Sequence, residues 1–168
     1  MRLTLFKKTG TIAVLVMLFG TYAQAQFGAP QGISASSVPT EQLILPEQLN
    51  DLLRGGDAGK PLILQVGSLL MFREAHIPGA EYAGAGSQAV GLQQLQARVA
   101  PFGHEKLIVL YCGCCPWNRC PNVGPAFKML HDLGFTHVKV LYLSDNFGTN
   151  WVDKGYPEQI CAPPQEAP

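Results

Sequence analysis

The sequence carries little charge and no excess of either sign. Only 14% of its 168 residues are charged, and twelve Lys and Arg balance twelve Asp and Glu. A chain so balanced lacks the basic surface that holds a polyanion, so we expect no nucleic-acid partner. Its hydrophobic share of 47% is too high for a chain that is disordered throughout. The composition therefore indicates a globular protein with a core.

Several sequence motifs are also absent. The chain contains no internal repeat, no glycine-rich dinucleotide fingerprint and no phosphate-binding loop that ends in Gly-Lys-Ser/Thr. These absences argue against a repeat protein and against the common nucleotide-dependent enzymes. A length of 168 residues suits one domain of ordinary size.

The chain has one long apolar run, residues 11–23, which is shorter than the roughly 20 residues of a membrane-spanning helix. Three basic residues precede the run, and no acidic residue occurs before Glu41. Residues 23–25 have the small-x-small pattern of a signal-peptidase site. We therefore predict a signal peptide over residues 1–25 with cleavage before Gln26; an uncleaved membrane anchor is the alternative.

Export follows from this prediction. The N-terminus has no twin-arginine pair and no cysteine placed to accept a lipid, so the mature chain is expected to leave the membrane. We expect it to be periplasmic or secreted, where disulfides persist. Its oligomeric state is left open by the sequence.

The mature chain divides into three parts by composition. Residues 26–42 are rich in Gly, Ala, Ser, Pro and Gln, and we interpret them as a flexible leader. Residues 43–160 form the predicted domain, and residues 161–168 a C-terminal tail.

Apolar strand-length runs alternate with helical patterns in the domain. Such alternation is typical of an α/β fold, a parallel sheet with helices on both faces. Strands are predicted at 62–66, 107–111 and 138–143, and helices at 46–53, 68–75, 88–99 and 126–133. Ligands of such sheets bind beyond the carboxyl ends of the strands.

A cysteine-rich loop follows the second predicted strand. Cys112, Cys114, Cys115 and Cys120 fall within nine positions, just before a helix. A thiol at a strand end that faces loop amides and a helix N-terminus is expected to have a lowered pKa, which makes it a nucleophile. Arg119 adds a positive charge that could pair with an anionic sulfur compound.

Other roles of the loop remain open. A local disulfide, Cys112 with Cys115 or Cys114 with Cys120, would make it an inert structural element. Cys112 and Cys115 also have the spacing of a redox-active pair. Clustered thiolates capture soft metals such as Cu(I) or Zn, although no His follows at ligand spacing. The distant Cys161 is either a free thiol or a partner of one of these four.

Five segments in order resemble the rhodanese-like (thiosulfate sulfurtransferase-like) domain family. The resemblance covers most of residues 43–160 and implies the family's α/β fold. The segments are the strand at 62–66, the His-Ile-Pro-Gly-Ala motif at 76–80, the strand ending in a cysteine at 108–112, the Leu-Gly-Phe segment at 133–135 followed by Val138, and the Trp-x-x-x-Gly-Tyr-Pro motif at 151–157.

This resemblance implies a sulfurtransferase that moves sulfane sulfur through a cysteine persulfide. The alignment of strands gives Cys112 as the nucleophile, whereas the usual interval of four residues before an arginine gives Cys114; we select Cys112 because packing anchors strand ends while loops absorb insertions. We expect Cys115, or else Cys114, to resolve the adduct on Cys112. A small sulfur-containing substrate and a thiol acceptor are the implied partners, and no external cofactor is needed.

The chain also departs from the family pattern. Gln65 and Gly67 stand where the family has an Asp and an Arg, and six residues separate Cys112 from Arg119, so the loop is expanded. A longer loop with an arginine is also found in related phosphatases, but the extra Cys and Pro residues do not fit them. His76 is expected to be structural and Trp151 to lie in the core.

Overall fold

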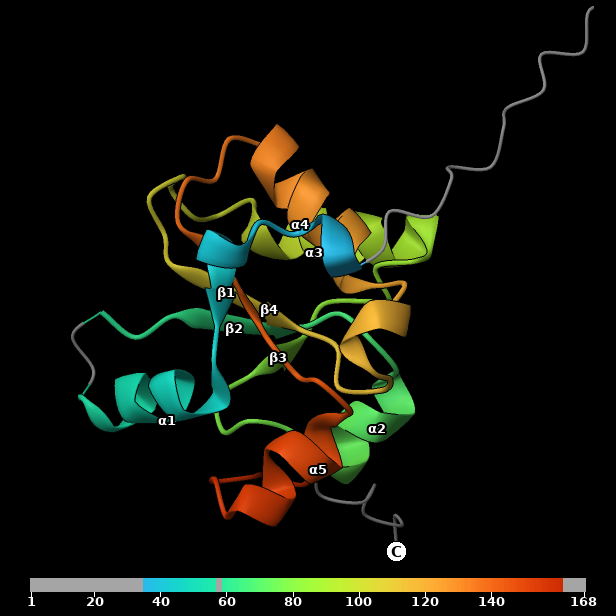
Figure 1. The fold of residues 1–168 in the computed structure, drawn as a ribbon. Coiled ribbons are helices and arrows are strands. Elements are labelled where there is room, and N and C mark those ends of the chain that lie inside the picture. The colour runs from blue at the N-terminus through green and yellow to red at the C-terminus, as the bar shows by residue number, and fades with distance from the viewer. Residues whose placement is uncertain (1–34, 57–58, 162–168) are drawn as a thin grey trace, which may run out of the picture.

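The protein is described by a computed structural model over residues 35–56 and 59–161. The predicted signal peptide, the cleavage site and residues 162–168 of the predicted tail lie outside these residues. The described chain forms a five-stranded sheet in the order β1-β5-β4-β2-β3, and every pair of neighbours is parallel (Figure 1). The fold is therefore α/β, as the alternating pattern predicts.

The three long strands form the middle of the sheet. They are β2 (Leu62–Gln65), β4 (Ile108–Tyr111) and β5 (Val138–Leu141), and nearly all their residues are buried. β4 lies between β2 and β5, with Gln65 of β2 opposite Tyr111 of β4. A parallel strand covered on both faces reads as a continuous apolar run, which is why all three were predictable.

Helices cover both faces of the sheet, as expected (Figure 1). One face packs against α3 (Ala89–Val99) and α4 (Val123–Asp132). The other face packs against α1 (Pro46–Arg54), α2 (Leu69–Glu74) and α5 (Phe147–Asn150). Side chains of β4 alternate between the two cores, because successive residues of a strand point to opposite faces.

The short elements were not predicted from the sequence. Strands β1 (Leu43–Ile44) and β3 (Glu81–Tyr82) are the two sheet edges and have two residues each. Four 3-10 helices complete the described chain; they are η1 (Ala35–Ser37), η2 (Thr40–Gln42), η3 (Trp117–Arg119) and η4 (Val152–Lys154).

Regular secondary structure begins earlier in the chain than we expected. Residues 35–42, placed in the flexible leader on composition, form η1 and η2 instead. Ala35 and Val38 are buried in the core beside α4. The backbone N–H of Ala35 also donates to the carbonyl oxygen of Cys120, 3.2 Å away. This segment therefore packs against the cysteine-rich loop, because long-range contacts compensate for its weak local preferences.

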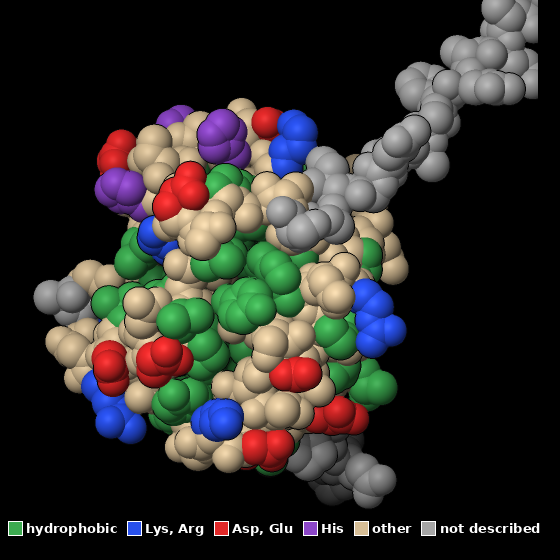
Figure 2. All heavy atoms as spheres, viewed as in Figure 1, with side chains coloured by type: hydrophobic (Ala, Val, Ile, Leu, Met, Phe, Trp, Pro, Cys, Tyr) green, Lys and Arg blue, Asp and Glu red, His purple; other side chains and the backbone are tan. Residues whose placement is uncertain are grey.

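The face of the molecule shown in Figure 2 has no strong bias of charge. Acidic and basic side chains are scattered over the face shown in Figure 2, and His residues gather at one end of it. No helix in residues 35–56 and 59–161 combines the length and the hydropathy that crossing a membrane requires.

Candidate active site

The cysteine-rich loop leaves the carboxyl end of the central strand. Cys112 directly follows β4, and the loop then passes through η3 to α4. Loops at the carboxyl edge of a parallel sheet are where ligands bind in open α/β folds. The sequence-based position of the candidate site is thus in agreement with the topology.

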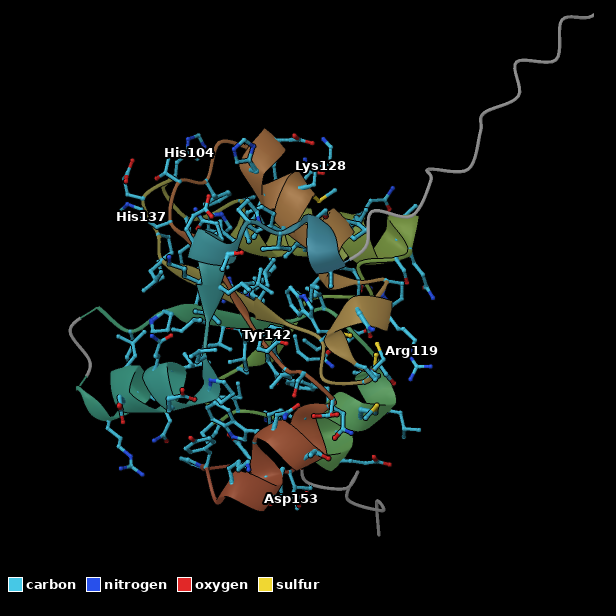
Figure 3. All side chains as sticks on the ribbon, viewed as in Figure 1. His104, Arg119, Lys128, His137, Tyr142 and Asp153 are labelled. Atoms are coloured by element: carbon cyan, nitrogen blue, oxygen red, sulfur yellow. The ribbon has the colours of Figure 1, made fainter. Side chains whose placement is uncertain are left out.

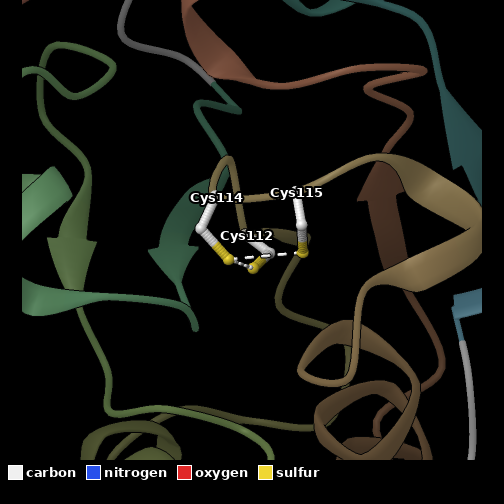
Figure 4. A group of neighbouring side chains, drawn as sticks. All are labelled: Cys112, Cys114 and Cys115. Carbon is white, nitrogen blue, oxygen red and sulfur yellow. Dashed lines mark hydrogen bonds between the residues drawn. The ribbon is translucent and has the colours of Figure 1, made fainter.

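Three thiols of this loop meet at one point (Figure 4). The Sγ atom of Cys114 lies 3.1 Å from that of Cys112 and 3.4 Å from that of Cys115. All three sulfur atoms lie within 4.8 Å of one another. Cys112 is buried, with 4% of its surface exposed, whereas the other two are partly accessible. All five cysteines of the chain are free thiols in this structure.

Asn122, just before α4, supports the thiols. Its Nδ2 donates to the Sγ of Cys112 at 3.3 Å and, at 3.9 Å, approaches the Sγ of Cys114. Its Oδ1 accepts the backbone N–H of Ser87 at 3.0 Å, which fixes the orientation of the amide. Asn122 is itself buried, so these contacts compensate for the burial of its polar group.

Gln65 and Gly67, the two departures from the family pattern, form the wall of the site. The Gln65 Nε2 donates to the carbonyl oxygen of Cys112 at 3.3 Å, and its Oε1 accepts the backbone N–H of Gly67 at 3.1 Å. A Cβ atom at position 67 would stand 2.8 Å from the Cys112 sulfur. The absence of a side chain there leaves the space that this sulfur occupies.

The pKa values of the clustered thiols differ. The pKa of Cys112 is raised, first by hydrogen bonding with Cys114, then by hydrogen bonding with Cys120, and also by burial. Hydrogen bonding with Cys112 lowers the pKa of Cys114 to about 6, with further support from Cys115 and Asn122. We expected a lowered pKa at Cys112, but the thiol with the lowered pKa is that of Cys114. The more accessible of two hydrogen-bonded thiols takes the charge, because burial disfavours the ionised form.

The pKa values of the other two loop thiols also shift in opposite directions, but here the buried thiol has the lowered value. The pKa of Cys115 is raised to about 12, first by burial and then by hydrogen bonding with Cys114. The pKa of Cys120 is lowered to about 6, first by hydrogen bonding with Cys112 and then by the backbone N–H groups of Val123 and Asn122. Backbone donors at a helix N-terminus stabilise an anion in this way.

Arg119 does not reach the thiols. It lies in η3, its side chain is exposed, and Figure 3 shows it pointing outward. Among residues 35–56 and 59–161 its side chain forms no hydrogen bond or ion pair. Trp117 of the same element packs against Tyr142 with ring centres 5.3 Å apart. Cys161 packs against the core on the opposite face of the sheet from the loop thiols.

His76 and Trp151 have structural contacts. The Nδ1 of His76 donates to the carbonyl oxygen of Phe72 at 2.8 Å, and the two rings stack. Trp151 is fully buried, and its Nε1 donates to the carbonyl oxygen of Pro157 at 2.8 Å. Both residues therefore agree with their predicted roles.

A cavity of about 160 Å³ lies behind the loop. Tyr111, Phe147 and Met71 line it together with Cys112 and Gly113. Tyr111 packs in the core with α2 and α5, whereas Cys112 packs in the core with α3 and α4. The cavity is thus formed mainly by residues of the face covered by α2 and α5, and it meets the thiol cluster at Cys112.

Asn122 was missed by the sequence analysis. The signal for it was available, because an Asn immediately before an apolar helical pattern is a favoured residue at a helix start. Its contact with sulfur depends on how the loop folds back toward Cys112, which no local pattern encodes.

The comparisons with known proteins concern the fold. No protein-family model matches the chain, and no curated protein matches it. A rhodanese-like domain of the Alr3790 protein from Anabaena superposes with a TM-score of 0.53 at 20% identity, covering 76% of this chain and 87% of that one. The BH2092 protein from Bacillus halodurans gives 0.55 at 21% identity, covering 70% and 76%. EanB in complex with hercynine gives 0.52 at 23% identity, covering 71% of this chain and 27% of EanB.

The five-stranded parallel sheet with helices of this chain matches the fold of these solved structures. Identities of 20% to 23% are low for transferring an activity, but the superposed architecture is shared. The chain therefore has the fold of a rhodanese-like domain.

Proposed function

We propose that this protein is a sulfurtransferase that moves sulfane sulfur through a cysteine persulfide. One observation carries the proposal: three thiols are in contact at the carboxyl end of the central strand of a rhodanese-like fold. A group of thiols held beside amide donors offers both a nucleophile and the hydrogen bonds that stabilise a charged sulfur.

Cys114 is the thiol that meets the donor in this proposal. Cys112 is buried beneath it, so an external molecule reaches Cys114 first. The Cys112 thiol lies 3.1 Å from the Cys114 sulfur, and the Asn122 Nδ2 approaches that sulfur at 3.9 Å. Cys112, which we selected from the strand alignment, becomes the positioning residue that holds the Cys114 thiolate.

The reaction has two steps. The Cys114 thiolate attacks the outer sulfur of thiosulfate; the S–S bond of the donor breaks, and sulfite leaves with the electron pair. The outer sulfur stays on Cys114 as a persulfide. An acceptor thiolate then attacks that sulfur, takes it, and returns Cys114 as a thiolate. No external cofactor enters either step.

Cys115 is the proposed resolving thiol. Its sulfur lies 3.4 Å from that of Cys114, so it can compete with an external acceptor for the persulfide: the Cys115 thiolate attacks the inner sulfur, a Cys114–Cys115 disulfide forms, the S–S bond of the persulfide breaks and hydrosulfide leaves. Replacing it by serine removes this competitor, and the persulfide should then last longer on the protein.

Sulfur transfer from thiosulfate to a thiol tests the function. Cys114→Ser should lose the activity, Cys112→Ser should reduce it, and Cys161→Ser is the matched control because this thiol lies on the other face of the sheet. Mass spectrometry should find one added sulfur on the peptide of the loop, and more of it in Cys115→Ser. Equal turnover in wild type and Cys114→Ser rejects the proposal. A Cys112–Cys115 disulfide in place of added sulfur would assign thiol–disulfide exchange instead.

Export is a further part of the proposal. The basic N-terminus, the short apolar run and the small-x-small site support it. N-terminal sequencing of the protein from the cell envelope should begin at Gln26. A chain that begins at Met1 and stays in the cytosol would contradict export.

A further inference from the structure

The three sulfur atoms of the cluster are also placed as a set of metal ligands, because they all lie within 4.8 Å of one another. We propose that Cys112, Cys114 and Cys115 form a three-coordinate site for Cu(I). The inference does not depend on the proposed sulfurtransferase activity, because it rests on the arrangement of the sulfur atoms as metal ligands.

The distances suit a small cation. Metal–thiolate bonds of about 2.3 Å place the sulfur atoms of a three-coordinate site about 4 Å apart. The sulfur atoms of Cys112 and Cys114 are 3.1 Å apart, those of Cys114 and Cys115 are 3.4 Å apart, and no pair exceeds 4.8 Å. The ideal separation lies within this range. Small rotations of the side chains therefore open the site without moving the backbone of the loop.

The ligand set selects a soft metal. Among residues 35–56 and 59–161, the cluster consists of thiols alone, with no His, Asp or Glu as a member. Hard cations such as Mg²⁺ and Ca²⁺ bind oxygen and are excluded by this chemistry, whereas Cu(I) and Zn²⁺ bind thiolates well.

The number of sulfur atoms separates Cu(I) from Zn²⁺. Structural zinc is almost always four-coordinate, and Cys120 would be the fourth ligand. The sulfur of Cys120, however, does not belong to the group of sulfur atoms that all lie within 4.8 Å of one another. Three thiols therefore remain to share one metal. Three thiolates satisfy Cu(I), which needs fewer ligands than zinc.

Hydrogen bonds around the cluster support the bound state. Asn122 donates to the sulfur of Cys112 and approaches that of Cys114, and the backbone N–H of Cys114 also donates to Cys112. Donors in this position spread the negative charge of bound thiolates and fix the ligands, as in other metal sites. Burial of Cys112 limits the access of water.

Binding is a simple exchange of protons for metal. As one Cu(I) enters, up to three S–H bonds break, three Cu–S bonds form and the protons pass to solvent. The metal remains Cu(I) throughout, so the step needs no oxidant and no reductant. The sulfur lone pairs used for copper are unavailable for attack on a donor, so copper and sulfane sulfur should exclude each other.

Anaerobic titration of the reduced, metal-free full chain with Cu(I) in competition with bicinchoninate tests the site. We expect one Cu(I) per chain, with an ultraviolet thiolate-to-copper charge-transfer band. Cys114→Ser and Cys115→Ser, which replace partly exposed thiols, should each weaken binding at least tenfold, about the loss that even outer contacts of metal sites cause. Cys161→Ser should bind as wild type does. Circular dichroism of each variant shows whether it is folded.

Three results would overturn the inference. The first is that wild-type protein gives up Cu(I) to the competitor. The second is that folded Cys114→Ser and Cys115→Ser bind Cu(I) as tightly as wild type does. The third is that wild type prefers Zn²⁺ and that Cys120→Ser loses this preference. The sulfur-transfer assay on copper-free protein is a separate readout. Wild-type protein that binds Cu(I) but does not transfer sulfur would refute the sulfurtransferase alone. Wild-type protein that transfers sulfur but does not bind Cu(I) would refute the copper site alone.

Discussion

Replacing Gly67 by alanine tests whether the space beside Cys112 holds the thiols in place. A Cβ atom at this position would meet the Cys112 sulfur at 2.8 Å, the Cys112 carbonyl oxygen at 2.9 Å and the Gln65 amide nitrogen at 3.1 Å. Ordinary contacts begin near 3.4 Å, so each neighbour must move by several tenths of an ångström. The sulfur can rotate away, but the carbonyl oxygen belongs to the backbone at the end of β4.

Overpacking of this kind costs about 1–3 kcal/mol. The rigid carbonyl places Gly67→Ala in the upper half of that range, which lowers the folded-to-unfolded ratio by roughly 30- to 150-fold. In urea unfolding the midpoint should fall while the slope stays constant, because the same surface is exposed. Sulfur transfer and Cu(I) binding should fall as well, because the displaced sulfur belongs to the cluster.

Gly103→Ala is the control for this experiment. Nothing lies within 4 Å of a Cβ atom at Gly103, so its stability should stay within about 0.5 kcal/mol of wild type. Equal midpoints for the two alanine variants, together with unchanged sulfur transfer in Gly67→Ala, would refute the steric reasoning.

Three further changes test other parts of the structure. Trp151→Phe removes the indole donor to Pro157 and some buried volume, so thermal unfolding should show a loss of about 1–3 kcal/mol; an unchanged Tm would contradict this. The Arg98 hydrogen bonds lower the pKa of Glu81, so this pair stabilises the protein above the carboxyl's unfolded pKa and the effect is lost as pH falls through the folded one. Arg98→Gln should therefore lose less stability than wild type between about pH 7 and about pH 3 in urea unfolding, and equal losses would argue against the pairing. Ala35→Asp buries a charge against the cysteine-rich loop and should cost at least about 2 kcal/mol and speed alkylation of the loop thiols, whereas wild-type behaviour would show that the segment does not pack there.

The sequence was sufficient for the elements with a strong apolar pattern. β2, β4 and β5 are continuous buried runs, and α4 repeats its apolar residues at helical spacing. The edge strands β1 and β3 were not predictable, because two residues carry no periodicity. The packing of Ala35 was also hidden, because a small residue in a Ser-rich segment is buried only through contacts made across the sequence.

The candidate site was also only partly predictable from the sequence. The crowding of Cys112, Cys114 and Cys115 was visible as spacing, and their contact in space follows from it. The directions of the pKa shifts could not be predicted from the spacing, because they depend on which thiol is buried and which amides point at it. The outward position of Arg119 was likewise unforeseen, since the expanded loop ends in a 3-10 helix that turns the residue to solvent.

The closeness of the loop thiols along the chain also bears on how the protein matures. Cys112 and Cys120 are eight positions apart, so their sulfur atoms collide often even in an unfolded chain, in which closing a loop of about ten residues takes about 10–100 ns. Gly67 and the β2 strand reach the site only when the parallel sheet assembles, and long-range pairing of this kind is slow. Oxidation of the nascent loop would therefore compete with folding, and the redox conditions during synthesis decide whether the thiols arrive in the folded site reduced.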